Sequence, residues 1–468
     1  MTNNINIEKR TFDDRDEYNR KPIAEKVISL LQKSSISVSP MIIDGGWGTG
    51  KTEFCHKLIN LISQDEQIIS QDEQKLNPIY INAFQADHAD EPLMTLLASI
   101  LSLMEKKENF DSSPFKKRII SVLRFSLKTI GKTSLIWVFK QGVDELNEGL
   151  KDEMNKTGNE IINNTVDALL KEHKDANKNI QVLQDALKKL TETSSIVIFV
   201  DELDRCRPDF AVSMLENIKH IFNVDGVQFV LVTNSEQLRA SINHSYGTSI
   251  DAKKYLDKFI RFSFTLPVTF LQTGKDQDLS TEHFCTLIEA DFPSLLNDQI
   301  KYFWVELFKN NQLSLREVET FTKNLKIYSL LASDKLEFTQ ENIGVPMLKI
   351  FGVFICSFFP ELQPKILIDN EEHKITAALR QKTIPNIETS TDVFWTLPDH
   401  MVQIIYVMFW MNAKTIDSKD NPWKNKDASK YWENNIRRLF PCAIKEGINH
   451  QVDIIKKVIK TLMLTDDN

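Results

Sequence analysis

The chain of 468 residues is poor in glycine and proline, with 14 and 15 of them, and holds five scattered cysteines without a CxxC pair. Scarce glycine and proline exclude a collagen-like or linker-rich architecture and favour helix. An odd number of separated cysteines argues against a disulfide framework or a zinc site, and it favours a reducing, cytoplasmic environment. These cysteines are Cys55, Cys206, Cys285, Cys356 and Cys442.

Long hydrophobic runs are also missing. The longest apolar stretch, residues 350–360, is too short to span a bilayer, and residues 1–17 are too polar for a signal peptide. We therefore expect no membrane anchor. The net charge of −8, from 57 Lys and Arg against 65 Asp and Glu, argues against a protein that coats nucleic acid through bulk charge. A local basic groove stays open.

Apolar runs alternate with helical patterns in residues 1–270. Such runs with helices between them are typical of a parallel sheet covered on both faces, so we expect an α/β core. A long helical segment is expected at about 105–190, and residues 271–468 are predicted to form a mostly helical second domain. The strand candidates are 36–43, 79–84, 196–200 and 227–233, and the expected helices of the core are 18–32, 52–62, 93–103 and 235–242.

The run Gly45-Gly46-Trp47-Gly48-Thr49-Gly50-Lys51-Thr52 matches the phosphate-loop pattern GxxxxGK[ST]. It lies between a strand candidate and a helix. Its glycines let successive main-chain amides face a phosphate, and the helix adds its positive dipole end. Lys51 is placed to reach the β- and γ-phosphates, Thr52 to ligate Mg²⁺, and Glu53 completes the nucleotide-binding segment. The sequence therefore predicts a site for ATP and Mg²⁺.

An acidic pair follows the apolar strand candidate 196–200. Asp201, at the carboxyl end of this strand, is expected to hold Mg²⁺, directly or through a water. Glu202 is then placed to polarise the attacking water as a general base. A buried strand that ends at an exposed acidic turn gives the same pattern, but the phosphate-loop motif favours the catalytic interpretation.

Three more polar residues are candidates for the site. Asn234 follows the strand candidate 227–233, where it is placed either to contact the γ-phosphate or to cap the next helix, and both interpretations stay open. Arg261 and Arg316 are candidates to stabilise γ-phosphate charge, in the same chain or from a neighbouring subunit. Most arginines in helical segments are instead solvated or ion-paired.

These motifs resemble those of the KAP family of P-loop NTPases. The phosphate loop is similar to the family's G-x-W-G-x-G-K-[ST], and the run Asp201-Glu202-Leu203-Asp204-Arg205-Cys206 is similar to its D-D-L-D-R-C. Ile81-Asn82-Ala83-Phe84 resembles the family's F-N-A-W strand, and residues 255–260 resemble its Y-L-x-K-x-[IV] segment. The resemblance covers about residues 18–330. It implies an AAA+-like ATPase core with a helical insertion, in which many members carry transmembrane helices.

The resemblance also implies a function. Glutamate as the second acid favours genuine hydrolysis, so we expect an ATPase that switches its helical half. Prokaryotic members often resemble components of antiviral defence systems, so a protein partner or effector is expected. A homo-oligomer is compatible with such sites, and basic residues within 115–143 argue against membrane helices there. Two alternatives remain: a non-hydrolysing ATP-bound scaffold for an effector, and a DNA-sensing or translocating ATPase supported only by basic residues at 118–132.

Overall fold

A computed structural model describes residues 7–64, 75–106, 180–272, 275–332, 344–367 and 449–465, apart from a few positions within these ranges. The chain divides into two compact units, Met1–Pro267 and Val268–Asn468. The boundary expected from the sequence is residue 270. Most of the expected helical insertion, including the basic residues at 118–132, lies outside the described residues.

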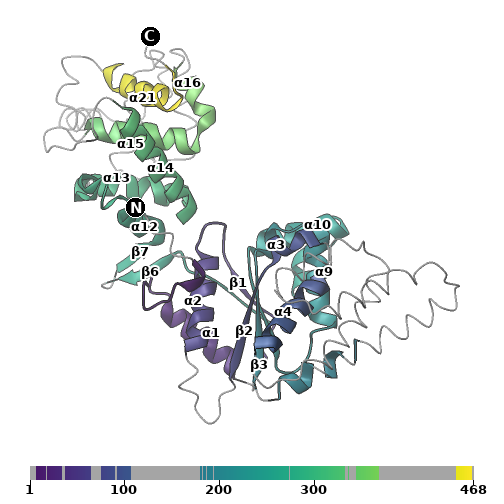
Figure 1. The fold of residues 1–468 in the computed structure, drawn as a ribbon. Coiled ribbons are helices and arrows are strands. Elements are labelled where there is room, and N and C mark those ends of the chain that lie inside the picture. Colours follow the sequence, from purple (N-terminus) through teal and green to yellow (C-terminus); the bar gives the residue numbers. More distant parts are fainter. Residues whose placement is uncertain are drawn as a thin grey trace, which may run out of the picture. The chain divides into compact units, whose positions relative to one another are not determined.

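The first unit is built on a five-stranded sheet (Figure 1). Every neighbouring pair is parallel, so the carboxyl ends of all strands lie at one edge. A single strand separates the strand that leads into the glycine loop from the strand that ends in the acidic pair. The spatial order is β2 (Leu76–Asn82), β3 (Ser195–Asp201), β4 (Val227–Thr233), β1 (Met41–Asp44) and β5 (Phe262–Thr265).

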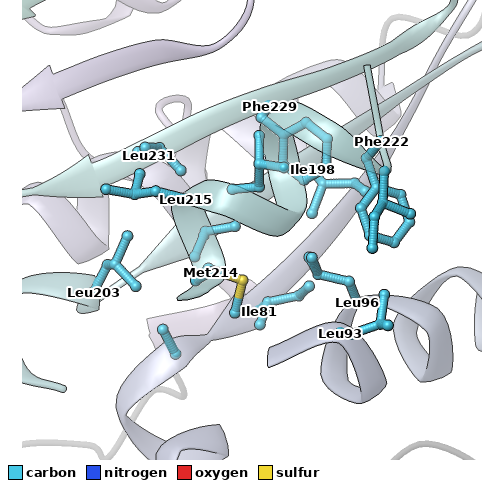
Figure 2. Packing of buried hydrophobic residues seen from close by; sticks show 14 of the residues in the cluster. Ile81, Leu93, Leu96, Ile198, Leu203, Met214, Leu215, Phe222, Phe229 and Leu231 are labelled. Atoms are coloured by element: carbon cyan, nitrogen blue, oxygen red, sulfur yellow. The ribbon is translucent and has the colours of Figure 1, made fainter. Parts of the chain in front are cut away.

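Helices cover both faces of this sheet because successive strand residues point to opposite sides. Val197 and Phe199 belong to a core shared with α1 (Lys21–Gln32) and α2 (Lys51–Gln64). Their neighbours Ile196 and Ile198 pack instead with the helices of the other face, where Leu96, Met214 and Phe229 also lie (Figure 2). These helices are α4 (Pro92–Lys106), α9 (Pro208–His220) and α10 (Ser235–Tyr246). The predicted α/β core with helices on both faces is confirmed.

Two strand boundaries differ from the sequence expectation. The first strand begins at Met41, because Pro40 has no N–H to give to a central ladder. The second begins at Leu76 and ends at Asn82, whose side-chain oxygen accepts from Gln85 N at 2.9 Å and starts the short helix α3 (Ala83–Ala86). A capping asparagine therefore ends the strand two residues early.

The second unit is mostly helical in its described part, as predicted. Its helices share an apolar core in which Phe284, Trp304, Phe308 and Phe321 are fully buried. An antiparallel hairpin of β6 (Thr269–Gln272) and β7 (Lys275–Asp278) precedes them and was not foreseen from the sequence. The helices are α12 (Leu279–Ile288), α13 (Asp298–Asn311), α14 (Leu315–Leu331), α15 (Gly344–Phe358), α16 (Gln363–Leu367) and α21 (Asn449–Leu462).

Short elements complete the described chain. They are α11 (Ala252–Leu256) and the 3-10 helices η1 (Ile7–Lys9), η3 (Asp87–Ala89), η4 (Leu203–Arg205), η5 (Pro293–Leu296) and η6 (Pro360–Leu362). Within the described segments no single helix has the length and apolarity to cross a membrane. Two consecutive segments together have the length and apolar composition to cross one, namely Gly344–Phe358 and Pro360–Leu367. They are bent by 109° relative to each other.

Candidate functional site

The predicted phosphate loop joins β1 to α2 at the carboxyl edge of the sheet. Gly48 and Gly50 have φ values of 75° and 80°, in the left-handed region that favours glycine. A Cβ on Gly45 would lie 2.9 Å from Thr49 Oγ1, so a side chain there would displace the loop. Because α2 begins at Lys51, its first amides and positive dipole end adjoin the loop. This is the geometry of an anion-binding loop.

Lys51 extends over this loop. Its Nζ donates hydrogen bonds to Gly45 O at 2.7 Å and to Gly46 O at 2.9 Å. Burial lowers the pKa of Lys51, and nearby carboxylates, Asp204 foremost, oppose that shift. A partly desolvated ammonium group at a ring of main-chain amides is suited to hold phosphate oxygens.

The two predicted metal ligands meet at the end of β3. Asp201 is 1% exposed, and the Thr52 side chain of α2 lies near its carboxylate. Tyr80 Oη donates to Asp201 Oδ2 at 3.2 Å, and Glu202 N donates to Oδ1 at 2.8 Å. Burial raises the pKa of Asp201 to about 6. A bound cation would therefore relieve the cost of a buried negative charge.

This donor set fits Mg²⁺, which prefers oxygen ligands and retains water or phosphate in several positions. Thr52 and Asp201 supply two such oxygens. Across the described ranges, no group of three or more His, Cys, Asp or Glu side chains is arranged to hold a metal by itself. A metal at this site would therefore take its other ligands from phosphates and water.

Glu202 follows directly and has the left-handed φ of 60°, which is uncommon for a residue other than glycine. Its two carboxylate oxygens have different partners: Asn82 Nδ2 donates to Oε2 at 3.1 Å, and Arg205 Nη1 lies 3.0 Å from Oε1. Backbone strain of this kind often accompanies functional positions. The contacts hold the carboxylate beside Asp201, where a general base is needed.

A second carboxylate of the same turn bridges two other elements. Trp47 Nε1 donates to Asp204 Oδ2 at 2.7 Å, and Thr233 Oγ1 donates to Asp204 Oδ1 at 3.0 Å. The phosphate loop, η4 and the end of β4 are thus joined through one side chain.

Sequence reasoning assigned no role to several residues at this site. Asn82 and Arg205 contact Glu202, and Asp204 contacts Trp47. The sequence signal for all three is their place in runs that resemble the family's motifs. Arg20 was also missed: its Nη2 donates to Thr49 O at 2.9 Å and to Pro267 O at 3.2 Å.

Two predicted nucleotide contacts have structural roles as well. The Asn234 side-chain oxygen accepts from Glu236 N at 3.0 Å and Gln237 N at 3.4 Å, so the residue caps α10. A contact between its amide nitrogen and the γ-phosphate stays a prediction. The Glu53 carboxylate pairs with Arg10 at 3.2 Å and with Lys57 at 3.1 Å, which leaves its main-chain amide for a phosphate.

The two arginine candidates belong to different units of the chain. Arg261 directly precedes β5, donates its main-chain N–H to Pro40 O at 2.9 Å, and donates its guanidinium N–H to the Ser37 hydroxyl. It therefore lies at the amino edge of the parallel sheet, about 13 Å of strand from the carboxyl edge. A role for Arg261 at the same chain's γ-phosphate is wrong, and a role in a neighbouring subunit stays a prediction. Arg316 lies in α14 of the second unit, and its role stays a prediction.

A parallel sheet with β4 between the loop-bearing strand and the acidic strand, together with a glycine loop that opens a helix, defines a P-loop NTPase core. The family model described as "KAP family P-loop domain" matches residues 20–332. The chain belongs to the KAP family of P-loop NTPases. This confirms the resemblance seen in its motifs.

Individual relatives add little to this assignment. The chain is 27% identical over 154 residues to the uncharacterized protein MJ0182 of Methanocaldococcus jannaschii, a match that covers 28% of this chain and 77% of that protein. Among solved structures it is similar to C. elegans PCH-2, with 11% identity and a TM-score of 0.27 over 74% of this chain and 69% of that chain. Neither similarity carries an argument about function.

Proposed function

We propose that this KAP NTPase binds Mg²⁺-ATP, hydrolyses it, and uses the cycle to switch its helical second unit. The observation that carries the proposal is the sheet order β3-β4-β1, whose parallel pairs place the phosphate loop and the acidic pair at the same carboxyl edge. It brings the end of the phosphate loop and the acidic pair into one site, although 149 residues separate them in the sequence (201 − 52). Both elements are needed for phosphoryl transfer.

Each residue has a defined task in this proposal. The loop amides and Lys51 bind the β- and γ-phosphates. Thr52 and Asp201 would hold Mg²⁺, which supplies charge neutralisation of the phosphates when it is bound. Glu202 orients the attacking water and accepts its proton at a carboxylate oxygen.

Two variants separate nucleotide binding from turnover. Lys51→Ala removes the phosphate-binding ammonium and should weaken ATP binding by about tenfold or more, as measured by calorimetry. Glu202→Gln keeps the side chain's size but removes the base, so it should bind ATP and lower phosphate release by about 10²- to 10⁴-fold. Glu289→Gln, at an exposed position after α12, is the matched control and should resemble the wild type. Equal turnover in wild type and Glu202→Gln would contradict the hydrolytic role.

One observation favours a second candidate, an ATP-bound scaffold that hydrolyses very slowly. The two oxygens of Glu202 already have Asn82 and Arg205 as partners, so one lone pair remains on each oxygen and the directions from which water can approach are restricted. Nucleotide that remains bound through purification, with no phosphate release, would favour this candidate. The DNA-dependent alternative rests on residues outside the described ranges, and an ATPase rate unchanged by DNA would argue against it.

The proposal extends to a role with a protein partner in a prokaryotic antiviral complex, and here its support is the family resemblance alone. Cells that express the chain with its neighbouring genes should resist phage, and the Lys51→Ala variant should remove that resistance. Plaque counts that do not differ between these strains and an empty-vector strain would contradict this extension. Calorimetry of ATP binding would still test the nucleotide chemistry independently of the plaque counts.

A further inference from the structure

The tryptophan of the phosphate loop has no task in the catalytic proposal, yet it makes a short polar contact. Trp47 is 52% exposed, although its indole N–H donates to Asp204 Oδ2 at 2.7 Å. Asp204 is 9% exposed and lies 157 residues away, in η4. Since half of the side chain stays exposed, this hydrogen bond is a directional contact that orients its ring.

The second oxygen of Asp204 has a partner in another element. Thr233 Oγ1 donates to it at 3.0 Å, and Thr233 is fully buried as the last residue of β4. In the sheet register Thr233 lies opposite Asp44, the residue before the glycine loop, and Asn234 follows it. Asp204 therefore joins the tip of the loop to β4. This strand lies between β1, which leads into the loop, and β3, which ends in the acidic pair.

The composition of the loop shows why these hydrogen bonds of Asp204 are useful for ordering its backbone. Glycine occupies positions 45, 46, 48 and 50, so the unliganded loop has more backbone freedom than other sequences of its length. Trp47 is the side chain in the middle of these glycines. Holding its indole ring restricts the loop at the point where its backbone is most free.

We propose that Asp204 is a positioning residue that holds the tip of the phosphate loop, through Trp47, against the end of β4, through Thr233. The bridge preorganises the main-chain amides for phosphate. Its effect on turnover rests on the proposed function, whereas the bridge itself can be measured without nucleotide.

The first test is nuclear magnetic resonance of the protein labelled with ¹⁵N at its tryptophan indoles. Comparison with Trp47→Phe identifies the Trp47 signal among the seven tryptophans. Asp204→Asn should move that signal upfield in its proton dimension, because a neutral amide accepts a weaker hydrogen bond than a carboxylate. The Trp304 indole, which donates to Leu295 O at 3.1 Å in the second unit, is an internal control that should not move. A Trp47 signal unchanged by Asp204→Asn would overturn the bridge.

The second test measures binding of Mg²⁺ with a non-hydrolysable ATP analogue. Trp47→Phe, which keeps an aromatic ring but removes the donor, and Asp204→Asn should each weaken binding by about fivefold to tenfold. The double variant should be no weaker than the weaker single variant, because both remove one bridge. Effects that multiply, or a Trp47→Phe variant with wild-type affinity and turnover, would overturn the proposal.

Thr233 supplies the conservative pair of variants. Thr233→Ser keeps the hydroxyl donor and should retain wild-type affinity, whereas Thr233→Val keeps the shape and should weaken binding as Trp47→Phe does. Equal affinities of these two variants would count against the bridge. Failure of the wild type to bind ATP would refute the proposed function, and the indole spectra would still decide whether the bridge exists.

Discussion

Replacing Asp201 by asparagine is predicted to stabilise the folded first unit while removing a ligand for Mg²⁺. The carboxyl group is 1% exposed, and burial raises its pKa from the ordinary 3.8 to about 6. At 1.36 kcal/mol per pH unit, ionisation of this group costs the folded state about 3 kcal/mol above pH 6. Asparagine avoids that cost, but it is a poorer acceptor for the Tyr80 hydroxyl and the Glu202 main-chain N–H. The net gain expected near neutral pH is therefore about 1–2 kcal/mol.

The direction of the pH dependence follows from the raised pKa. When the folded pKa lies above the unfolded value, the group's contribution to stability is complete below pH 3.8 and is lost as pH rises to about 6. Asparagine does not titrate. The stability advantage of Asp201→Asn should therefore grow from about pH 4 to about pH 6 and stay constant at higher pH.

Urea unfolding between about pH 4.5 and about pH 7.5 measures this difference. Pulsed hydrogen exchange of peptides from β3 and β4 restricts the measurement to the first unit, because these strands form its core. Asp209→Asn, at an exposed position of α9, is the control and should show no such pH-dependent gain. A stability difference for Asp201→Asn that is independent of pH, or a loss of stability near neutral pH, would refute the reasoning.

Three further predictions concern other parts of the chain. Gly352→Ala should destabilise the second unit by about 1–3 kcal/mol, because its Cβ would lie 2.8 Å from Val458 Cβ on α21; thermal unfolding measures this, and adding Val458→Ala should restore part of the loss. Asn82→Asp should keep the cap of α3 but place a second carboxylate against Glu202, so turnover should fall about tenfold at similar ATP affinity; an unchanged rate would contradict the role of this contact. Arg20→Met should lower the stability of the first unit by about 2 kcal/mol or more in urea unfolding, since two main-chain carbonyls lose a buried donor, and a change below a few tenths would argue against that role.

The sequence predicted β1 to β4 of the core sheet because their signals are local, and it missed the edge strand β5. Apolar β-branched runs are enough to locate β3 and β4, and a glycine loop before a helical pattern locates the phosphate site. The hairpin of β6 and β7 escaped prediction, because each strand has four residues and the second, Lys275–Asp278, is wholly polar. Such segments carry too few alternating positions to show a period.

The contacts around the acidic pair could not be predicted, since they depend on which strands are neighbours. Asn82 reaches Glu202 only because β2 lies beside β3 with Asn82 opposite Asp201 in register. Arg261 could not be placed for a similar reason: the strand that it precedes, β5, has four residues and was not among the strand candidates.

The most direct test of the central claim is a crystal structure with Mg²⁺ and a non-hydrolysable ATP analogue. The account predicts a metal about 2.1 Å from Thr52 Oγ1, with Asp201 as a ligand or one water away, and phosphates against the loop amides. Glu202 should face the γ-phosphate. A nucleotide bound elsewhere, or a metal held without Thr52 and Asp201, would contradict it.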